Sequence, residues 1–61
     1  MYYRTINGRS YYSYSIHKTR ERAESALEDY FAAGEICEAE RPEIARLSEA
    51  SGRFAVMFPG F

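Results

Sequence analysis

The sequence holds very little of the chemistry that enzymes and metal sites use. It contains one cysteine and one histidine, Cys37 and His17, in 61 residues. A single cysteine forms no internal disulfide, which suits a reducing compartment. A structural zinc site needs about four ligands, and a nucleophilic cysteine needs a histidine and a third orienting group. We interpret Cys37 as a buried, inert thiol and His17 as a partly solvated connector residue. The sequence therefore predicts no catalytic residue, no metal and no cofactor.

Other features that the sequence lacks exclude further classes of protein. There is no glycine-rich phosphate loop, no apolar run long enough to span a membrane, and no apolar signal segment at the beginning of the chain. Paired carboxylates such as Glu24 and Glu28 do occur. A chain of this size has little room for both a core and a catalytic pocket of ~300 Å³, so a solvated helix surface is the better explanation of the pair. These features predict a soluble, cytoplasmic protein that is not an enzyme.

Acidic residues are missing from both ends of the chain. All nine lie between Glu21 and Glu49, whereas residues 1–20 carry four cations and five of the six tyrosines. The net charge of -1 therefore conceals a strong segregation of charge along the sequence. Since a surface of one sign attracts partners of the other, we look for function in the surfaces of the protein.

Residues 1–16 predict a β-hairpin. Asn7-Gly8 lies between two tyrosine-rich runs, and this dipeptide favours a two-residue type I′ turn. The expected cross-strand pairs are Ile6 with Arg9, Arg4 with Tyr11, and Tyr3 with Tyr12. The face expected in the core carries Met1, Tyr3, Thr5, Ser10, Tyr12, Tyr14 and Ile16. The face expected at the surface carries Tyr2, Arg4, Ile6, Arg9, Tyr11, Ser13 and Ser15.

The remainder of the chain predicts two helices and a third strand. Thr19 is a suitable N-cap for a helix over about residues 20–33, and Gly34 is a suitable stop. Pro42 favours the first turn of a second, shorter helix over about residues 42–50. Residues 53–58 alternate like a strand. The predicted fold is a single α+β domain over residues 1–61, in the order β-β-α-α-β, with a three-stranded antiparallel sheet packed on two helices in two layers. The predicted core consists of Met1, Tyr3, Tyr12, Tyr14, Ile16, Ala23, Leu27, Tyr30, Phe31, Ile44, Leu47, Phe54, Val56 and Phe58.

The acidic residues of the first helix and of the segment after it form one candidate surface. Glu21, Glu24 and Glu28 repel one another at helical spacing, at a cost of about 0.2–0.5 kcal/mol a pair. Spaced carboxylates on a rigid scaffold imitate the regular charge of a DNA backbone and would occupy the basic groove of a nucleic-acid-binding protein. The simpler interpretation is an ordinary solvated helix surface. The predicted partner-binding residues are Glu21, Glu24, Glu28, Asp29, Glu35, Glu38, Glu40 and Glu43.

The outer face of the hairpin is the alternative candidate surface. Aromatic rings beside arginines on an open sheet are typical of modules that bind single-stranded nucleic acids, in which the rings stack on bases and the cations contact phosphates. The simpler explanation is that tyrosine favours strands. The residues of this alternative nucleic-acid face are Tyr2, Arg4, Arg9 and Tyr11.

A short soluble chain with one cysteine, a tyrosine-rich hairpin and acidic helices resembles the small phage and mobile-element proteins that disarm host nucleases. Anti-CRISPR proteins are the best-known group among them. The resemblance covers the whole chain in size, composition and charge layout. It implies a non-enzymatic inhibitor that binds a CRISPR effector or a similar host complex. We expect this protein to act as a monomer in the cytoplasm of a bacterial host cell, without direct contact to nucleic acid or membrane.

Overall fold

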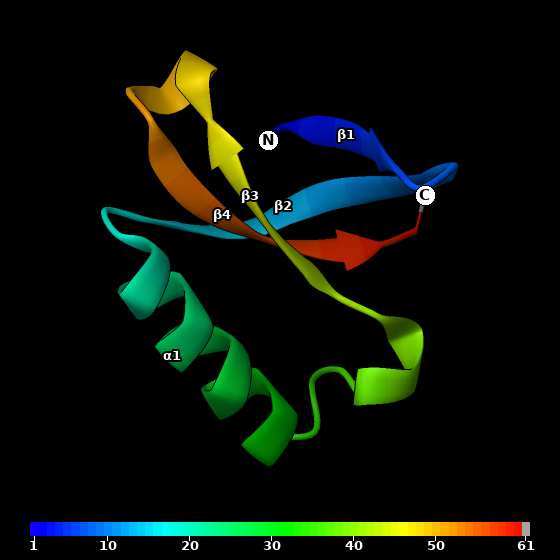
Figure 1. Ribbon diagram of the computed structural model, residues 1–61. Coiled ribbons are helices and arrows are strands. Elements are labelled where there is room, and N and C mark those ends of the chain that lie inside the picture. Colours follow the sequence, from blue (N-terminus) through cyan, green and yellow to red (C-terminus); the bar gives the residue numbers. More distant parts are fainter. Residues whose placement is uncertain (61) are drawn as a thin grey trace.

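A computed structural model describes residues 1–60 of the protein (Figure 1). The regular elements are β1 (Tyr3–Ile6), β2 (Arg9–His17), α1 (Arg20–Ala32), β3 (Glu43–Leu47) and β4 (Arg53–Pro59). Two short 3₁₀ turns, η1 (Glu38–Glu40) and η2 (Ser48–Ala50), flank β3. The four strands form one antiparallel sheet in the order β1-β2-β4-β3. The sheet is curled, and α1 lies along one of its faces.

The N-terminal hairpin has the register that its turn favours. Ile6 pairs with Arg9 and Tyr3 with Tyr12. Asn7 and Gly8 have φ values of 51° and 79°. A type I′ turn needs positive φ at both central positions, and asparagine and glycine adopt it at the least cost.

The helix begins and ends at local signals. Thr19 is its N-cap, and the Thr19 hydroxyl accepts a hydrogen bond from the backbone N–H of Arg22 at 3.1 Å. Gly34, just beyond the C-cap, has a φ of 75° that other residues rarely adopt. Both ends are therefore determined by residues within a few positions of them.

The predicted second helix over residues 42–50 is wrong, and so is the β-β-α-α-β fold with three strands on two helices. This segment forms β3 and η2, and the fold has one helix and four strands. Ile44 and Leu47, three positions apart, share a face on a helix but lie on opposite faces of a strand. The structure has an apolar cluster on each face of the sheet: Ile44 packs against one, and Leu47 is buried in the other. Pairing with β3 also gives β4 a second neighbour, which leaves it with no open edge.

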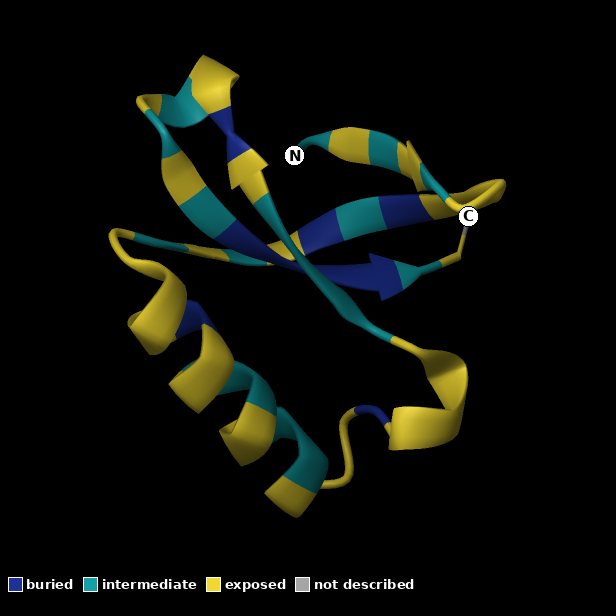
Figure 2. Cartoon of the chain, viewed as in Figure 1, coloured by how far each residue is buried: buried dark blue, intermediate teal, exposed yellow. Residues whose placement is uncertain are grey.

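The sheet thus buries side chains on both of its faces. Figure 2 shows an unbroken buried stretch in β4, whose successive side chains point to opposite faces. The cluster beneath α1, here called the helix-side core, consists of Ala23, Ile36, Val56 and Phe58. The cluster on the opposite face, here called the far-side core, consists of Tyr11, Leu47, Ala55 and Met57. Ile6 from β1, and Tyr2 just before this strand, pack against the far-side core together with Ala45 from β3. Residues from both edges of the sheet thus pack against one cluster on the same face, which is consistent with the curl of the sheet.

The far-side core buries much of the hairpin face that is predicted at the surface. Tyr11 and Ser13, predicted at the surface, are only 3% and 7% exposed. Four residues predicted in the core are exposed: Met1, Tyr3, Tyr14 and Ile16. A β-bulge between Ser13 and Ser15 also shifts the alternation of β2 by one residue, so Ile16 lies opposite Ala55 and no longer shares the face of Tyr12, which pairs with Phe58. Of the other predicted core residues, Ala23, Leu47, Val56 and Phe58 are buried, and Tyr12, Leu27, Tyr30, Phe31, Ile44 and Phe54 are half-buried.

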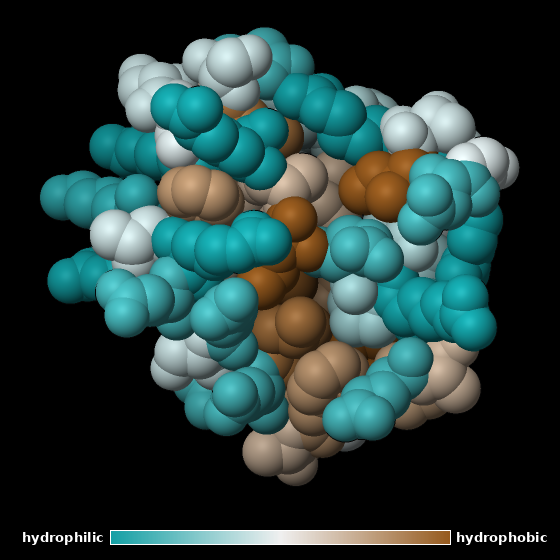
Figure 3. Space-filling view, in the orientation of Figure 1, coloured by the Kyte–Doolittle hydropathy of each residue, from teal (hydrophilic) through white to brown (hydrophobic). Residues whose placement is uncertain are grey.

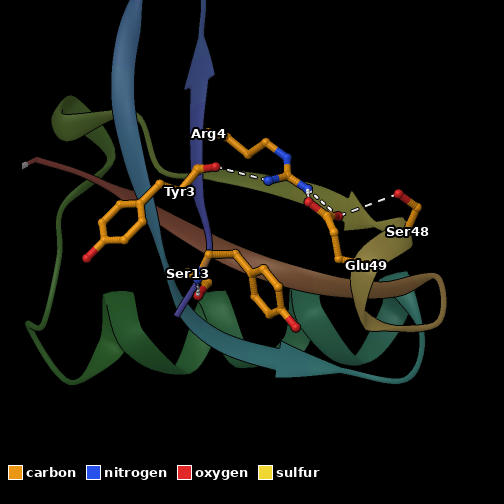
Figure 4. A network of polar contacts seen from close by, with 6 residues as sticks. Tyr3, Arg4, Ser13, Ser48 and Glu49 are labelled. Carbon is orange, nitrogen blue, oxygen red and sulfur yellow. Dashed lines mark hydrogen bonds and ion pairs between the residues drawn. The ribbon is translucent and has the colours of Figure 1, made fainter.

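An ion pair joins β1 to η2 across the curl (Figure 4). Nη2 of Arg4 lies 2.5 Å and 2.6 Å from the two carboxylate oxygens of Glu49, and Nη1 donates to the carbonyl of Tyr3 at 2.9 Å. The hydrogen bond from Arg4 is the main reason why the pKa of Glu49 lies below its usual value. Glu49, the last acidic residue of the chain, therefore supports the fold.

We expect Glu49→Gln to destabilise the protein near neutral pH and to lose this effect in acid. A carboxyl whose pKa is lowered in the folded state stabilises the fold above its ordinary pKa of about 4.3. That contribution disappears as the pH falls through the lowered folded-state value. Urea unfolding midpoints of the variant and the wild type should therefore differ at about pH 7 and converge once the pH lies below the lowered folded-state pKa.

Glu38→Gln is the control for this experiment. Glu38 is exposed and forms no ion pair within residues 1–60, so its replacement should leave the midpoint unchanged at both pH values. A difference between wild type and Glu49→Gln that stays constant with pH would show that the charge of Glu49 is not what stabilises the fold.

Candidate binding surfaces

Four carboxylates project from the outer side of α1. Glu21, Glu24, Glu28 and Asp29 are all exposed, since the helix turns its apolar residues toward the helix-side core. Figure 3 shows hydrophilic side chains over α1 and apolar atoms in the seam between α1 and β3. Arg20 Nε lies 3.8 Å from Glu24 Oε2, with both side chains more than half exposed. Such a pair contributes only ~0–1 kcal/mol. The other three carboxylates form no ion pair within residues 1–60.

The connector between α1 and β3 continues this negative surface. Glu35, Glu38 and Glu40 are exposed. A hollow of about 450 Å³ in the connector is lined by Phe31, Gly34, Glu35, Ile36, Cys37, Glu38 and Glu40. Glu43 differs from its neighbours in sequence, because it is half-buried in β3 opposite Met57. We define the acidic surface as the seven exposed carboxylates Glu21, Glu24, Glu28, Asp29, Glu35, Glu38 and Glu40.

Tyr14 anchors one end of the connector to the sheet. Its ring stacks on Phe58, with centroids 4.1 Å apart and an interplanar angle of 14°, and it meets Tyr30 edge-on at 5.0 Å. The Tyr14 hydroxyl donates a hydrogen bond to Oε1 of Glu35. This hydrogen bond, followed by desolvation, raises the pKa of Tyr14 above its ordinary value. Glu35 is thereby held by a stack of aromatic rings that also belongs to the helix-side core.

The residues of the alternative nucleic-acid face have structural contacts instead. Tyr11 is buried, and its hydroxyl donates to the carbonyl of Arg41 at 2.7 Å. Tyr2 packs against the far-side core, and Arg4 is held by Glu49. Arg9 is exposed, with its Cζ 5.7 Å from the centroid of the Tyr11 ring. The Tyr11 ring is therefore not open for stacking on a base, and the Tyr2 ring is half-buried.

Cys37 is exposed, contrary to the prediction that it is buried. The connector buries Ile36 instead, which leaves Cys37 at the N-cap of η1 with its Sγ 3.6 Å from Glu40 Oε2. His17 ends β2 and is half-buried, with Nε2 2.7 Å from Ser15 Oγ. Within residues 1–60, no group of three or more histidine, cysteine or acidic side chains is placed to hold a metal ion.

The sheet also brings together residues that sequence analysis kept apart. His17 and Arg46 both lie opposite Phe54, one from β2 and the other from β3. Arg20, at the beginning of α1, has its Cζ 5.9 Å from the centroid of the Phe54 ring. We define the basic patch as His17, Lys18, Arg20 and Arg46 around Phe54. No spacing in the sequence indicates this group, because it depends on which strands pair and in what register.

No helix within residues 1–60 has both the length and the apolar character needed to cross a bilayer. Comparisons of the chain with protein families, with curated proteins and with solved structures find no match. The acidic surface and the basic patch are the two candidate functional sites.

Proposed function

We propose that the protein is a non-enzymatic inhibitor whose acidic surface occupies the basic groove of a nucleic-acid-binding protein. The observation that carries this proposal is the exposure of seven carboxylates on α1 and the connector, of which one, Glu24, has an ion pair within residues 1–60. Carboxylates spaced along a rigid element offer a lysine- and arginine-lined groove the charge pattern of a nucleic-acid backbone. A CRISPR effector is a host complex of this kind, and the resemblance to anti-CRISPR proteins supports it as the first to test.

The position of two carboxylates favours a binding role over a merely solvating one. Glu28 and Asp29 lie near the C-terminal end of α1, and no basic residue lies in its last turn. The helix dipole places partial negative charge at this end, so acidic side chains here destabilise the free protein. A cationic partner would offset this unfavourable interaction.

We expect Glu28→Gln combined with Asp29→Asn to weaken inhibition of a CRISPR effector by at least about tenfold, because close interfacial charge pairs contribute more than 1.4 kcal/mol. The measurement is cleavage of target DNA by the purified effector over a range of inhibitor concentrations. Inhibition should also weaken as salt increases, since the Debye length falls from about 10 Å at 0.1 M to about 3 Å at 1 M.

The matched control exchanges the two residues, Glu28→Asp with Asp29→Glu, and keeps both charges. It should inhibit like the wild type. The neutral variant should be at least as stable as the wild type in thermal unfolding, since it removes negative charge from the C-terminal end of the helix. Weaker inhibition would then reflect lost binding and not lost folding. Equal inhibition by the neutral variant and the wild type would refute the role of the acidic surface.

A further inference from the structure

The basic patch lies on the same side of the sheet as α1. Phe54 packs against the helix-side core, and directly opposite residues of an antiparallel pair share a face. His17 and Arg46, which flank Phe54 in the register, therefore lie on this side too. Arg20 approaches the same ring from the first turn of α1, and Lys18 precedes it in the connection from β2. Three permanent cations thus belong to this patch: Arg20 lies against the half-buried Phe54 ring, Arg46 is its register partner on β3, and Lys18 follows His17 in the chain.

Little negative charge opposes these cations. Arg20 has Glu24 at 3.8 Å, whereas Lys18 and Arg46 form no ion pair within residues 1–60. The guanidinium of Arg46 lies over Gly52, where an added Cβ would come within 3.0 Å of Nη2. The glycine therefore leaves room for the guanidinium. Because the patch adjoins the beginning of α1, the positive end of the helix dipole adds to its potential.

We propose that the basic patch binds the phosphate backbone of a nucleic acid. Guanidinium groups match the geometry of phosphate oxygens with two parallel hydrogen bonds. The patch extends from β2 across β4 to β3, a width of about 10 Å at the usual strand spacing. A surface of this width suits a polymer with repeated phosphates better than one small anion.

This inference goes beyond the proposed function and departs from the sequence-based expectation of no direct contact with nucleic acid. The acidic surface runs along the outer side of α1 and the connector, and Glu21 and Glu24 bring it close to Arg20 at the beginning of the helix. The other residues of the patch lie on the strands and in the connection from β2 to α1. A host protein that carries its own nucleic acid presents both a basic groove and a chain of phosphates. Such a complex would engage the two surfaces together.

The test is fluorescence anisotropy with a labelled single-stranded oligothymidylate at about 50 mM salt, where phosphate contacts are strong. The wild type should bind. Lys18→Gln combined with Arg46→Gln should weaken binding by at least about tenfold. The fall of log affinity with log salt should also become less steep, by about one unit of slope for each cation removed. The matched control, Arg9→Gln with Arg53→Gln, removes the same charge outside the patch and should bind like the wild type. Circular dichroism of each variant would check that it is folded.

Two outcomes overturn the proposal: no binding by the wild type at this salt, or an equal loss of affinity in the patch variant and the control. The acidic-surface variant, Glu28→Gln with Asp29→Asn, separates this inference from the proposed function. It should bind the oligonucleotide as well as the wild type does, because it leaves the patch intact. If the wild type binds the oligonucleotide but does not inhibit the effector, the proposed function is refuted and the binding of nucleic acid by the basic patch is not.

Discussion

Leu47→Ala should cost the folded protein about 2–5 kcal/mol, which is a large fraction of the stability of any small domain. Leu47 has no exposed surface and lies in the far-side core with Tyr11, Ala55 and Met57. Its removal leaves a cavity in the far-side core, on the face of the sheet away from α1. Urea unfolding followed by circular dichroism would measure the loss.

Leu27→Ala is the matched control, because it removes the same atoms from a half-buried position on α1. Leu27 packs against the helix-side core and keeps part of its surface in water, so its truncation should cost clearly less than that of Leu47. A loss for Leu27→Ala equal to or larger than that for Leu47→Ala would contradict the presence of a core on the face away from the helix.

The turns and helix ends that depend on neighbouring residues could be predicted from the sequence. Asn7-Gly8 specifies a turn with positive φ at both positions, and this turn sets the register of β1 with β2. Thr19 and Gly34 specify the two ends of α1 in the same way. Each of these decisions depends on a few adjacent residues, so the sequence alone contains the information.

The prediction for residues 42–50 is wrong because the same pattern of apolar residues fits both a helix and a strand. Ile44 and Leu47 fit a helix with one buried face and equally fit a strand between two cores. The choice depends on whether the sheet has a second core. That core is made of residues from β2, β3 and β4, with residues of β1 and η2 packed against it. The ion pair between Arg4 and Glu49 joins residues 45 positions apart and has no local signal.

The same distinction applies to the candidate surfaces. The carboxylates of α1 could be placed at the surface because the apolar stripe of the helix defines its opposite side. The alternative face of the hairpin was misplaced because its exposure depends on the curl of the sheet. The basic patch was missed because the pairing of β4 with both β2 and β3 assembles it.

Phe58→Ala should destabilise the protein by about 3–5 kcal/mol. Phe58 is 5% exposed, and its ring contacts three tyrosines. Tyr14 stacks on it, while Tyr12 and Tyr30 meet it edge-on with centroids 6.2 Å and 5.8 Å away. Each aromatic pair adds about 0.5–1.5 kcal/mol to the effect of burial, although contributions within one cluster are not additive. The loss is measured by urea unfolding at neutral pH.

Phe31→Ala provides the comparison, because Phe31 belongs to the same helix-side core but is half-buried. Its truncation should cost less than Phe58→Ala, and the reverse order would contradict the central place of Phe58.

Tyr14→Phe separates packing from hydrogen bonding, since it keeps the ring on Phe58 and removes the hydroxyl that binds Glu35. The raised pKa of Tyr14 means that this hydrogen bond stabilises the fold below the ordinary tyrosine pKa of about 10 and is lost as the pH rises through the folded-state value. The stability difference between Tyr14→Phe and wild type should therefore shrink in strong alkali, whereas the loss in Phe58→Ala should remain.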